Sequence, residues 1–151
     1  HSLFCLRSYS LLCIALRSEG FTCISACFLP FALAANRQVL VDFNAMEEYK
    51  DCGYPDGMTV DTNGKMWLSC YAAGRFINID PETGKLLRTV PFPASNTTSC
   101  CFGGENYDEL FVTSAWKGLT AEKHRAEPLA GSVFRVTGLG AKGFAAYAFN
   151  R

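Results

Sequence analysis

Hydrophobic residues are arranged in two different ways along this chain, and the change falls near Asn36. From Asn36 onward, short runs rich in β-branched and aromatic residues are separated by Gly, Pro, Asn and Asp. These turns recur about every ten residues and helical periodicity is nearly absent, which is typical of an all-β domain. Residues 1–35 are instead apolar and cysteine-rich, and only two Arg and one Glu carry charge there.

The β-rich part predicts two successive four-stranded antiparallel units. The turns of the first unit end in Gly64, Gly74 and Gly84, and glycine readily takes the positive φ that tight hairpins need. A polar and partly helical connection is expected at 46–49. The predicted strands are 37–43, then 57–61, 65–71, 75–80 and 85–91, and finally 98–102, 109–115, 132–137 and 142–149.

The second unit begins at Thr98 in the way that the first begins at Asp56. Four-stranded units that recur at this spacing, about every 40–45 residues, are typical of β-propeller blades. Two blades cannot close a ring, and a blade normally packs against two neighbours. We therefore expect exposed blade faces and self-association through them. An open β-sandwich of eight strands is the alternative arrangement.

Four sequence blocks occur in order between residues 54 and 143. They are YPDGMTVDTNGKMWLSCY (54–71), GR with IDPETGK (74–75, 79–85), TTSCCFGG with LFVT (97–104, 110–113), and GSVF with VTGLG and KG (131–134, 136–140, 142–143). Together they resemble the C-terminal part of the senescence-marker-30, regucalcin and gluconolactonase family. The resemblance implies a partial six-bladed β-propeller, with about two four-stranded antiparallel blades in residues 36–151 and a non-homologous segment at 1–35.

The resemblance implies that Asp56 is both a metal ligand and the base that takes a proton from water. In the family, the metal lies at the mouth of the central channel. Carboxylate and amide ligands suit Ca²⁺, Zn²⁺, Mg²⁺ or Mn²⁺. Such a cation can polarise the carbonyl of a sugar lactone and activate water for its hydrolysis. Without the resemblance, residues 55–57 read as a plain turn.

The same resemblance implies that this chain carries only part of the site. The other metal ligands, a Glu and an Asn, belong to earlier blades, as do the Arg, Asn and Glu that contact substrate. Asp56 alone cannot hold a metal tightly, so we expect this chain by itself to be weakly active or inactive. Three hypotheses stay open: a lactone hydrolase, a non-catalytic calcium-binding regulatory protein, and an inactive fragment.

Other motifs have plain structural interpretations. Residues 61–64 (DTNG) resemble the start of an EF-hand loop, but Gly is in the wrong place and Ala72 replaces the required Glu, so we predict a hairpin turn. Thr98 and Ser99 are expected to be ordinary strand hydroxyls, although they could line the channel. The polar insertion at 116–131 is expected to be surface rather than a cover for the channel end.

The cysteines do not indicate a zinc site. There are eight, without a Cys-x-x-Cys pair, and the only histidines are His1 and His124. Buried free thiols are the expected state of Cys52, Cys70, Cys100 and Cys101. Because Cys100 and Cys101 are adjacent in a strand, they should point to opposite faces.

Charge and hydropathy exclude two classes of partner. The 14 Lys and Arg balance the 14 Asp and Glu, so there is no basic footprint for nucleic acid. The apolar stretch 21–33 is broken by Pro30 and is too short for a membrane span.

The cellular compartment follows from the family resemblance, which predicts a cytoplasmic protein. Residues 32–34 (ALA) have the form of a signal-peptidase site, so secretion is the alternative if residues 1–34 act as a signal. The chain does not begin with Met, and we interpret residues 1–35 as a replaced or artefactual segment of a longer protein. The sequon at Asn96 matters only for a secreted chain.

Overall fold

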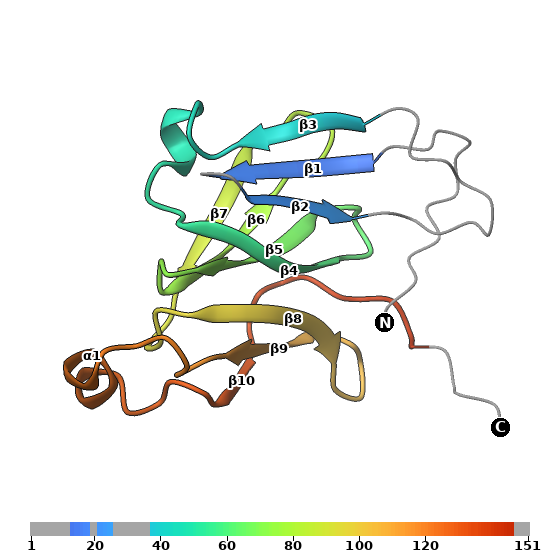
Figure 1. Ribbon diagram of the computed structural model, residues 1–151. Coiled ribbons are helices and arrows are strands. Elements are labelled where there is room, and N and C mark those ends of the chain that lie inside the picture. The colour runs from blue at the N-terminus through green and yellow to red at the C-terminus, as the bar shows by residue number, and fades with distance from the viewer. Residues whose placement is uncertain (1–12, 19–20, 26–36, 147–151) are drawn as a thin grey trace, which may run out of the picture.

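Three β-sheets stacked in layers make up the fold (Figure 1). The computed structural model describes residues 13–18, 21–25 and 37–146, and the expected signal-peptidase site at 32–34 lies outside them. The helices are η1 (Glu47–Tyr49) and α1 (Ala121–Ala126). The strands are β1 (Cys13–Ser18), β2 (Phe21–Ser25), β3 (Arg37–Asp42), β4 (Tyr54–Val60), β5 (Met66–Tyr71), β6 (Arg75–Ile79), β7 (Leu86–Pro91), β8 (Thr97–Gly103), β9 (Glu109–Ser114) and β10 (Val133–Val136).

The middle layer is the antiparallel meander β4-β5-β6-β7, which confirms the first predicted unit. Its turn glycines Gly64, Gly74 and Gly84 all adopt positive φ. β4 begins at Tyr54, before the predicted start at Gly57. Residues 55–57 therefore lie within a strand, and the interpretation of this tripeptide as a plain turn is wrong.

The middle sheet is buried on both faces, and this determines how the layers pack. Successive strand residues point to opposite faces, so Leu68 and Trp67 in β5 enter different cores. One core lies against β3 and η1, and the other lies against the third sheet. The first core contains Val41, Phe43, Tyr49, Cys52, Met66, Leu68, Cys70, Ile77 and Ile79. The second contains Trp67, Phe76, Cys100, Leu110, Val112, Leu139 and Ala141.

The DTNG segment is a hairpin turn, as predicted. The Asp61 carboxylate is 3% exposed and accepts hydrogen bonds from the backbone N–H groups of Asn63 and Lys65, both at 2.9 Å. Its other oxygen accepts from Trp67 Nε1 at 3.0 Å. These three donors satisfy the buried Asp61 carboxylate, which holds the turn in place.

The third layer, β10-β9-β8, has three strands, so the prediction of a fourth strand at 142–149 is wrong for residues 142–146. Residues 147–149 lie outside the described part. After β10 the chain turns back and inserts Leu139 and Ala141 into the second core. The backbone of this returning segment hydrogen-bonds to the turns of other hairpins: Thr62 N donates to Lys142 O (2.7 Å), and Gly143 N donates to Tyr107 O (2.8 Å). The Lys142 carbonyl and the Gly143 N–H are therefore not available to pair with β10.

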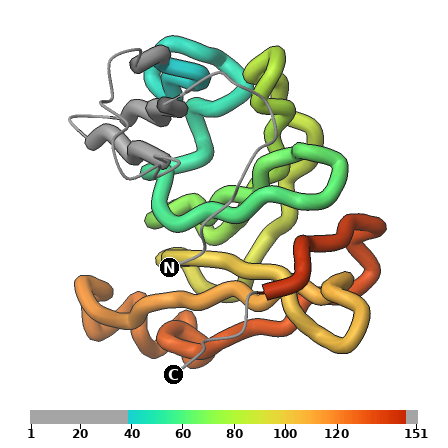
Figure 2. Tube along the Cα trace, turned by 90° about the vertical axis from the view of Figure 1, so that its right-hand side faces the viewer, coloured from blue at the N-terminus to red at the C-terminus, as the bar shows by residue number. Residues whose placement is uncertain are grey.

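The first layer has the order β2-β1-β3, and β1 runs parallel to β3. The all-β class is confirmed, and the second and third layers are both antiparallel meanders. Three layers joined through two cores do not form the alternative two-sheet sandwich. Figure 2 shows the layers from the side. Among the described residues, no helix is both long and apolar enough to span a membrane.

Core packing on the first face can be tested with two leucines. Leu68 is 0% exposed, whereas Leu87 on the outer strand β7 is 45% exposed. We expect Leu68→Ala to lower the free energy of unfolding by about 2–5 kcal/mol, because it leaves a cavity. Leu87→Ala should cost less than about 1 kcal/mol. Urea unfolding measures both values, and equal losses would contradict the described packing.

Candidate functional site

Asp56 lies on a β-bulge near the start of β4. Pro55 pairs with Cys70 and Met58 with Leu68, so Asp56 and Gly57 together face the single residue Ser69. A bulge bends the strand and redirects its side chains, and bulges are common beside active sites. The bulge therefore gives this carboxylate an orientation that a regular strand would not provide.

Burial changes the chemistry of the Asp56 carboxyl group. The residue is half-buried, and removal from water raises the pKa of the carboxyl above its usual range. The Gly57 backbone N–H donates to the carboxyl and opposes part of this rise. An acid with a raised pKa is a better proton acceptor when ionised, as a general base requires.

The bulge brings β4 against β8, the first strand of the next sheet. A Cβ atom on Gly57 would lie 2.4 Å from Ser99 Oγ and 2.8 Å from Ser99 Cα, so only glycine fits here. Gly57 directly follows Asp56 and Ser99 directly follows Thr98, so the two residues occupy the same place in the two predicted units. Equivalent positions of the two units are thus in contact, and the first strands of both sheets lie side by side.

Ser69 is a polar residue of this region that the sequence analysis missed. It is 0% exposed, and its hydroxyl lacks a hydrogen-bond partner of good geometry among the described residues. The hydroxyl is nevertheless close enough to the Cys100 thiol to lower that thiol's pKa, against the larger effect of burial, which raises it to about 12. A serine within the apolar strand MWLSCY was the available signal, because an unsatisfied buried hydroxyl is costly.

Thr97 and Thr98 hold the start of β8 in place. Thr97 is 0% exposed, and its hydroxyl accepts from Cys70 N at 3.1 Å and lies 2.8 Å from the Arg75 carbonyl. Thr98 shares a hydrogen bond of 2.7 Å with the Thr113 hydroxyl. The Thr98 hydroxyl thus has a partner within its own sheet, and the expectation that it is an ordinary strand hydroxyl stays a prediction. Thr97 links the two sheets at the end where Asp56 lies.

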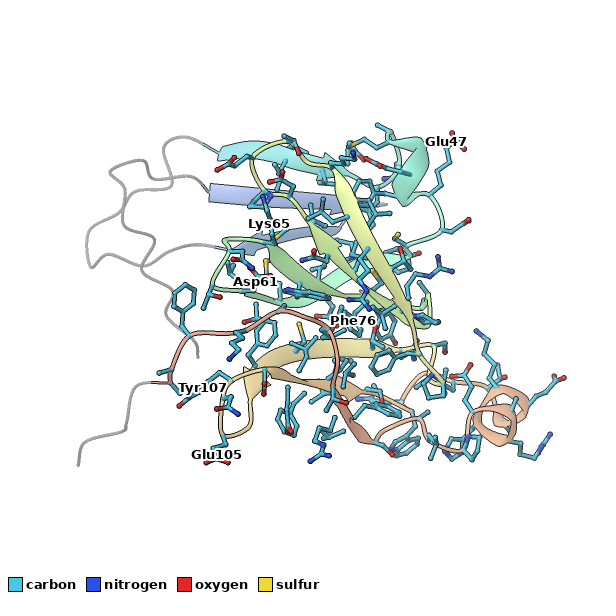
Figure 3. The ribbon with its side chains drawn as sticks, turned by 180° about the vertical axis from the view of Figure 1, so that it is seen from behind. Glu47, Asp61, Lys65, Phe76, Glu105 and Tyr107 are labelled. Carbon is cyan, nitrogen blue, oxygen red and sulfur yellow. The ribbon has the colours of Figure 1, made fainter. Side chains whose placement is uncertain are left out.

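The insertion after β9 lies at this same end. Tyr54 pairs with Tyr71, so the start of β4 and the β5–β6 turn share one end, which faces η1 and α1 in Figure 3. Asp61 and Tyr107 mark the opposite end. The α1 helix buries none of its residues, so this part of the insertion lies at the surface, and the choice between plain surface and a cover for the channel end stays a prediction. Glu127 anchors it, because its carboxylate accepts from Ser95 N and Oγ, both at 2.8 Å.

The interface between the sheets forms a shallow groove beside this anchor. It encloses about 350 Å³ and is lined by residues of the β5–β6 turn, the β7–β8 link and Glu127. The two Ser95 hydrogen bonds lower the pKa of the Glu127 carboxyl, so it is ionised at neutral pH. The groove is open, and no second acid stands beside Glu127 among the described residues that line it.

Asp56 is the only predicted metal ligand, and the described residues do not surround it with others. Within the described ranges, no group of three or more His, Cys, Asp or Glu side chains could hold a metal ion. Ca²⁺ takes about six to eight oxygen ligands and Zn²⁺ about four ligands. Asp56 could therefore fill one coordination position of such a metal site, but the described residues do not supply the other ligands.

The cysteine predictions largely hold. Cys52, Cys70 and Cys100 are buried free thiols, whereas Cys101 is exposed. Cys100 and Cys101 point to opposite faces of the strand, as predicted. The prediction that Cys101 is buried is wrong, because Cys101 faces away from the second core. Asn96 is 4% exposed, so the sequon lies in a poor position for a glycan in the folded chain.

Comparison with known proteins decides the family. Residues 26–116 match the model of the SMP-30/Gluconolactonase/LRE-like region, which is more than half of the chain. The chain belongs to this family. The matched SMP-30/gluconolactonase range contains Asp56, its bulge and the starts of both blade-like sheets. It begins before Asn36, and the boundary at residue 35 stays a prediction.

Members of the SMP-30/gluconolactonase family with high similarity include regucalcins. The regucalcin of Danio rerio is 53% identical over 100 residues, covering 66% of this chain and 34% of the relative. That of Homo sapiens is 53% identical over 95 residues, covering 63% of this chain and 32% of the relative. This chain therefore spans about a third of the length of the curated relatives that it matches.

Two solved structures of the family support the fold. A luciferin-regenerating enzyme is 44% identical with a TM-score of 0.58, covering 66% of this chain and 33% of that protein. The regucalcin of Agrobacterium tumefaciens, described as a calcium-binding protein, is 27% identical with a TM-score of 0.62, covering 71% and 34%. The described layers are thus those of a regucalcin-type protein over the shared part.

The raised pKa of Asp56 predicts a dependence of stability on pH. Ionisation is less favourable in the folded than in the unfolded chain, so wild type should lose stability as pH rises from the ordinary carboxyl pKa to the raised folded value. Asp56→Asn stays neutral at nearly constant shape. We expect this variant to be more stable than wild type at pH 7 and equal to it near pH 3, measured by urea unfolding. If wild type were more stable than Asp56→Asn at pH 7, this would contradict a desolvated Asp56 carboxylate.

Proposed function

We propose that this protein is part of a divalent-metal-dependent lactone hydrolase of the gluconolactonase and regucalcin type. The observation that carries the proposal is Asp56, a half-buried carboxylate on a bulge near the start of β4, within the range that matches the family model. In this proposal Asp56 supplies one oxygen ligand to Ca²⁺ or Zn²⁺, with Mg²⁺ or Mn²⁺ as alternatives. The substrate is a small sugar lactone.

The proposed division of labour follows from the chemistry of the residues present. A bound cation would supply the positive charge that polarises a lactone carbonyl and acidifies water. Asp56 would orient that water and accept its proton, a role that its raised pKa supports. The remaining ligands are expected from blades outside this chain, in line with the length of the relatives. We therefore expect low activity from this chain alone.

A non-catalytic calcium-binding role is the second candidate. It is favoured by the similarity to the Agrobacterium tumefaciens protein, which is described as calcium-binding. The two candidates share the Asp56 ligand and differ in whether water attacks a bound lactone. An inactive fragment is the third possibility, in which neither metal nor lactone is bound.

We also propose a ring of six blades and a cytoplasmic location for the whole protein. The outer face of the third sheet supports a need for further blades, because Cys101 and Val133 on it are exposed, Val133 by 64%. Burying such a face favours association, so self-association of this chain through it is part of the proposal. Neither nucleic acid nor a membrane is proposed as a partner.

Metal titration with Asp56→Asn tests the proposal. We expect wild type to bind Ca²⁺ weakly, with a Kd of about 1 mM or above, because Asp56 supplies one of the six to eight oxygen ligands that Ca²⁺ takes. Asp56→Asn should weaken this binding by roughly tenfold or more, because the charged ligand is lost. Any metal-dependent hydrolysis of an aldonolactone should fall with it. Calorimetry measures binding, and pH-stat titration measures hydrolysis.

Asp51→Asn is the matched control, because Asp51 is an exposed carboxylate close to Asp56 in sequence. It should leave both measurements unchanged. Saturable Ca²⁺ binding without hydrolysis would favour the calcium-binding protein. Equal metal binding by wild type and Asp56→Asn would remove Asp56 from the site and refute the proposal.

A further inference from the structure

Two cysteines lie side by side in the first core, next to the strand that carries Asp56. Cys52 precedes β4 and Cys70 belongs to β5, and both are free thiols with exposures of 2% and 0%. Both belong to the same core cluster, and each thiol lies close enough to shift the pKa of the other. They are well separated in sequence and form no Cys-x-x-Cys motif, so their adjacency becomes visible only in the fold.

The backbone enforces this adjacency. Gly53 has a φ of +62°, and a Cβ atom there would lie 2.3 Å from the Tyr71 carbonyl oxygen and 3.1 Å from Ala73 Cβ. Only glycine therefore allows the chain before β4 to approach the end of β5 so closely. Cys52 N also donates to Tyr49 O at 2.9 Å. The position of Cys52 beside Cys70 is thus fixed by main-chain contacts on both sides.

The surroundings make the two thiols chemically different. Arg75 is directly opposite Cys70 in the β5–β6 register. The neighbouring Cys70 thiol and the charge of Arg75 lower the pKa of Cys52, against burial and the nearby Asp51 and Glu48. The pKa of Cys70 is raised, mainly by the neighbouring Cys52 thiol and by burial. Cys52 thus has the greater thiolate character and Cys70 is placed to resolve its oxidised form, and because both thiols are buried a peroxide reaches them through local opening of the core.

We propose that Cys52 and Cys70 form an intramolecular disulfide when the protein is exposed to a peroxide. The Cys52 sulfur attacks one peroxide oxygen, the O–O bond breaks, and water leaves, which yields a sulfenic acid. The Cys70 sulfur then attacks the Cys52 sulfur and displaces a second water. In total, two thiols and one hydrogen peroxide give one disulfide and two waters, so the sulfurs are oxidised and the peroxide is reduced.

The disulfide would join the chain just before β4 to β5, close to Asp56. The segment that leads into the bulge would then be held covalently as well as by the Gly53 contact. The inference goes beyond the proposed function and does not rest on it, because it concerns only thiols and an oxidant. Disulfide formation is measured without any lactone or metal.

Peptide mapping of the oxidised full-length chain tests the proposal directly. Trypsin separates the two cysteines into neighbouring peptides, 51–65 and 66–75, each with a single cysteine, whereas Cys100 and Cys101 fall together in 89–117. After peroxide treatment and alkylation, we expect the 51–65 and 66–75 peptides as a linked pair. Its mass is about 2 Da below the sum of the two free peptides, and reduction separates them.

Two comparisons make the test decisive. Cys101→Ala removes an exposed cysteine and should leave the linked pair unchanged, whereas Cys52→Ala should abolish it and leave Cys70 open to alkylation. If Cys52→Ala does not fold, the comparison is made with wild type oxidised in concentrated urea. The linked pair should be severalfold more abundant in native wild type than in wild type in urea. Equal abundance in urea, or absence of the pair in the native chain while other cysteines cross-link, would overturn the proposal.

Discussion

Close contact between β4 and β8 at Gly57 and Ser99 is the constraint on which the arrangement of the two blade-like sheets depends. The Oγ, Cβ and Cα atoms of Ser99 occupy the space that a Cβ atom on residue 57 would need. Both strands come first in their sheets, so the later strands extend away from this point. The second core, which contains Trp67, fills the space between the sheets around Phe76 (Figure 3).

The same contact explains why polar groups gather at one end of the interface. The β-bulge lies where β4 comes so close to β8, and it places Asp56 opposite Ser69 at a half-buried site. Burial then raises the pKa of the carboxyl, while the Thr97 hydroxyl ties the start of β8 to the end of β5. Packing and chemistry are thus connected, because the geometry that joins the sheets also desolvates the residue expected to act on substrate.

The sequence predicted the regular parts of this fold well. Tight turns with glycine at positive φ and short alternating runs identify the meander β4–β7, because both features act locally. The predicted repeat holds only in part, since the first unit is a four-stranded sheet and the second has three strands among the described residues. The Asp56 residue could be selected only through the family resemblance, since a Pro-Asp-Gly tripeptide by itself indicates a turn.

What the sequence did not predict depends on contacts between distant segments. The bulge at Asp56 is defined by the register with β5, and the approach of Cys52 to Cys70 depends on Gly53 meeting Tyr71. The run at 142–149 has strand-like composition. Residues 142–146 nevertheless form no strand, because burial of Leu139 and Ala141 directs the chain back between the sheets. The serine in the apolar strand MWLSCY was a visible signal, but the lack of a hydrogen-bond partner for Ser69 among the described residues becomes apparent only in the fold.

The unfolding free energy of Gly57→Ala tests the central contact most directly. Gly57 is not among the glycines with positive φ, so its backbone conformation is open to alanine and steric overlap with Ser99 is the main cost. Overpacking of this kind costs about 1–3 kcal/mol, and we expect a loss in that range by urea unfolding. An unchanged or increased stability would show that β4 and β8 do not meet at Gly57, and would contradict this account of the sheets and of Asp56.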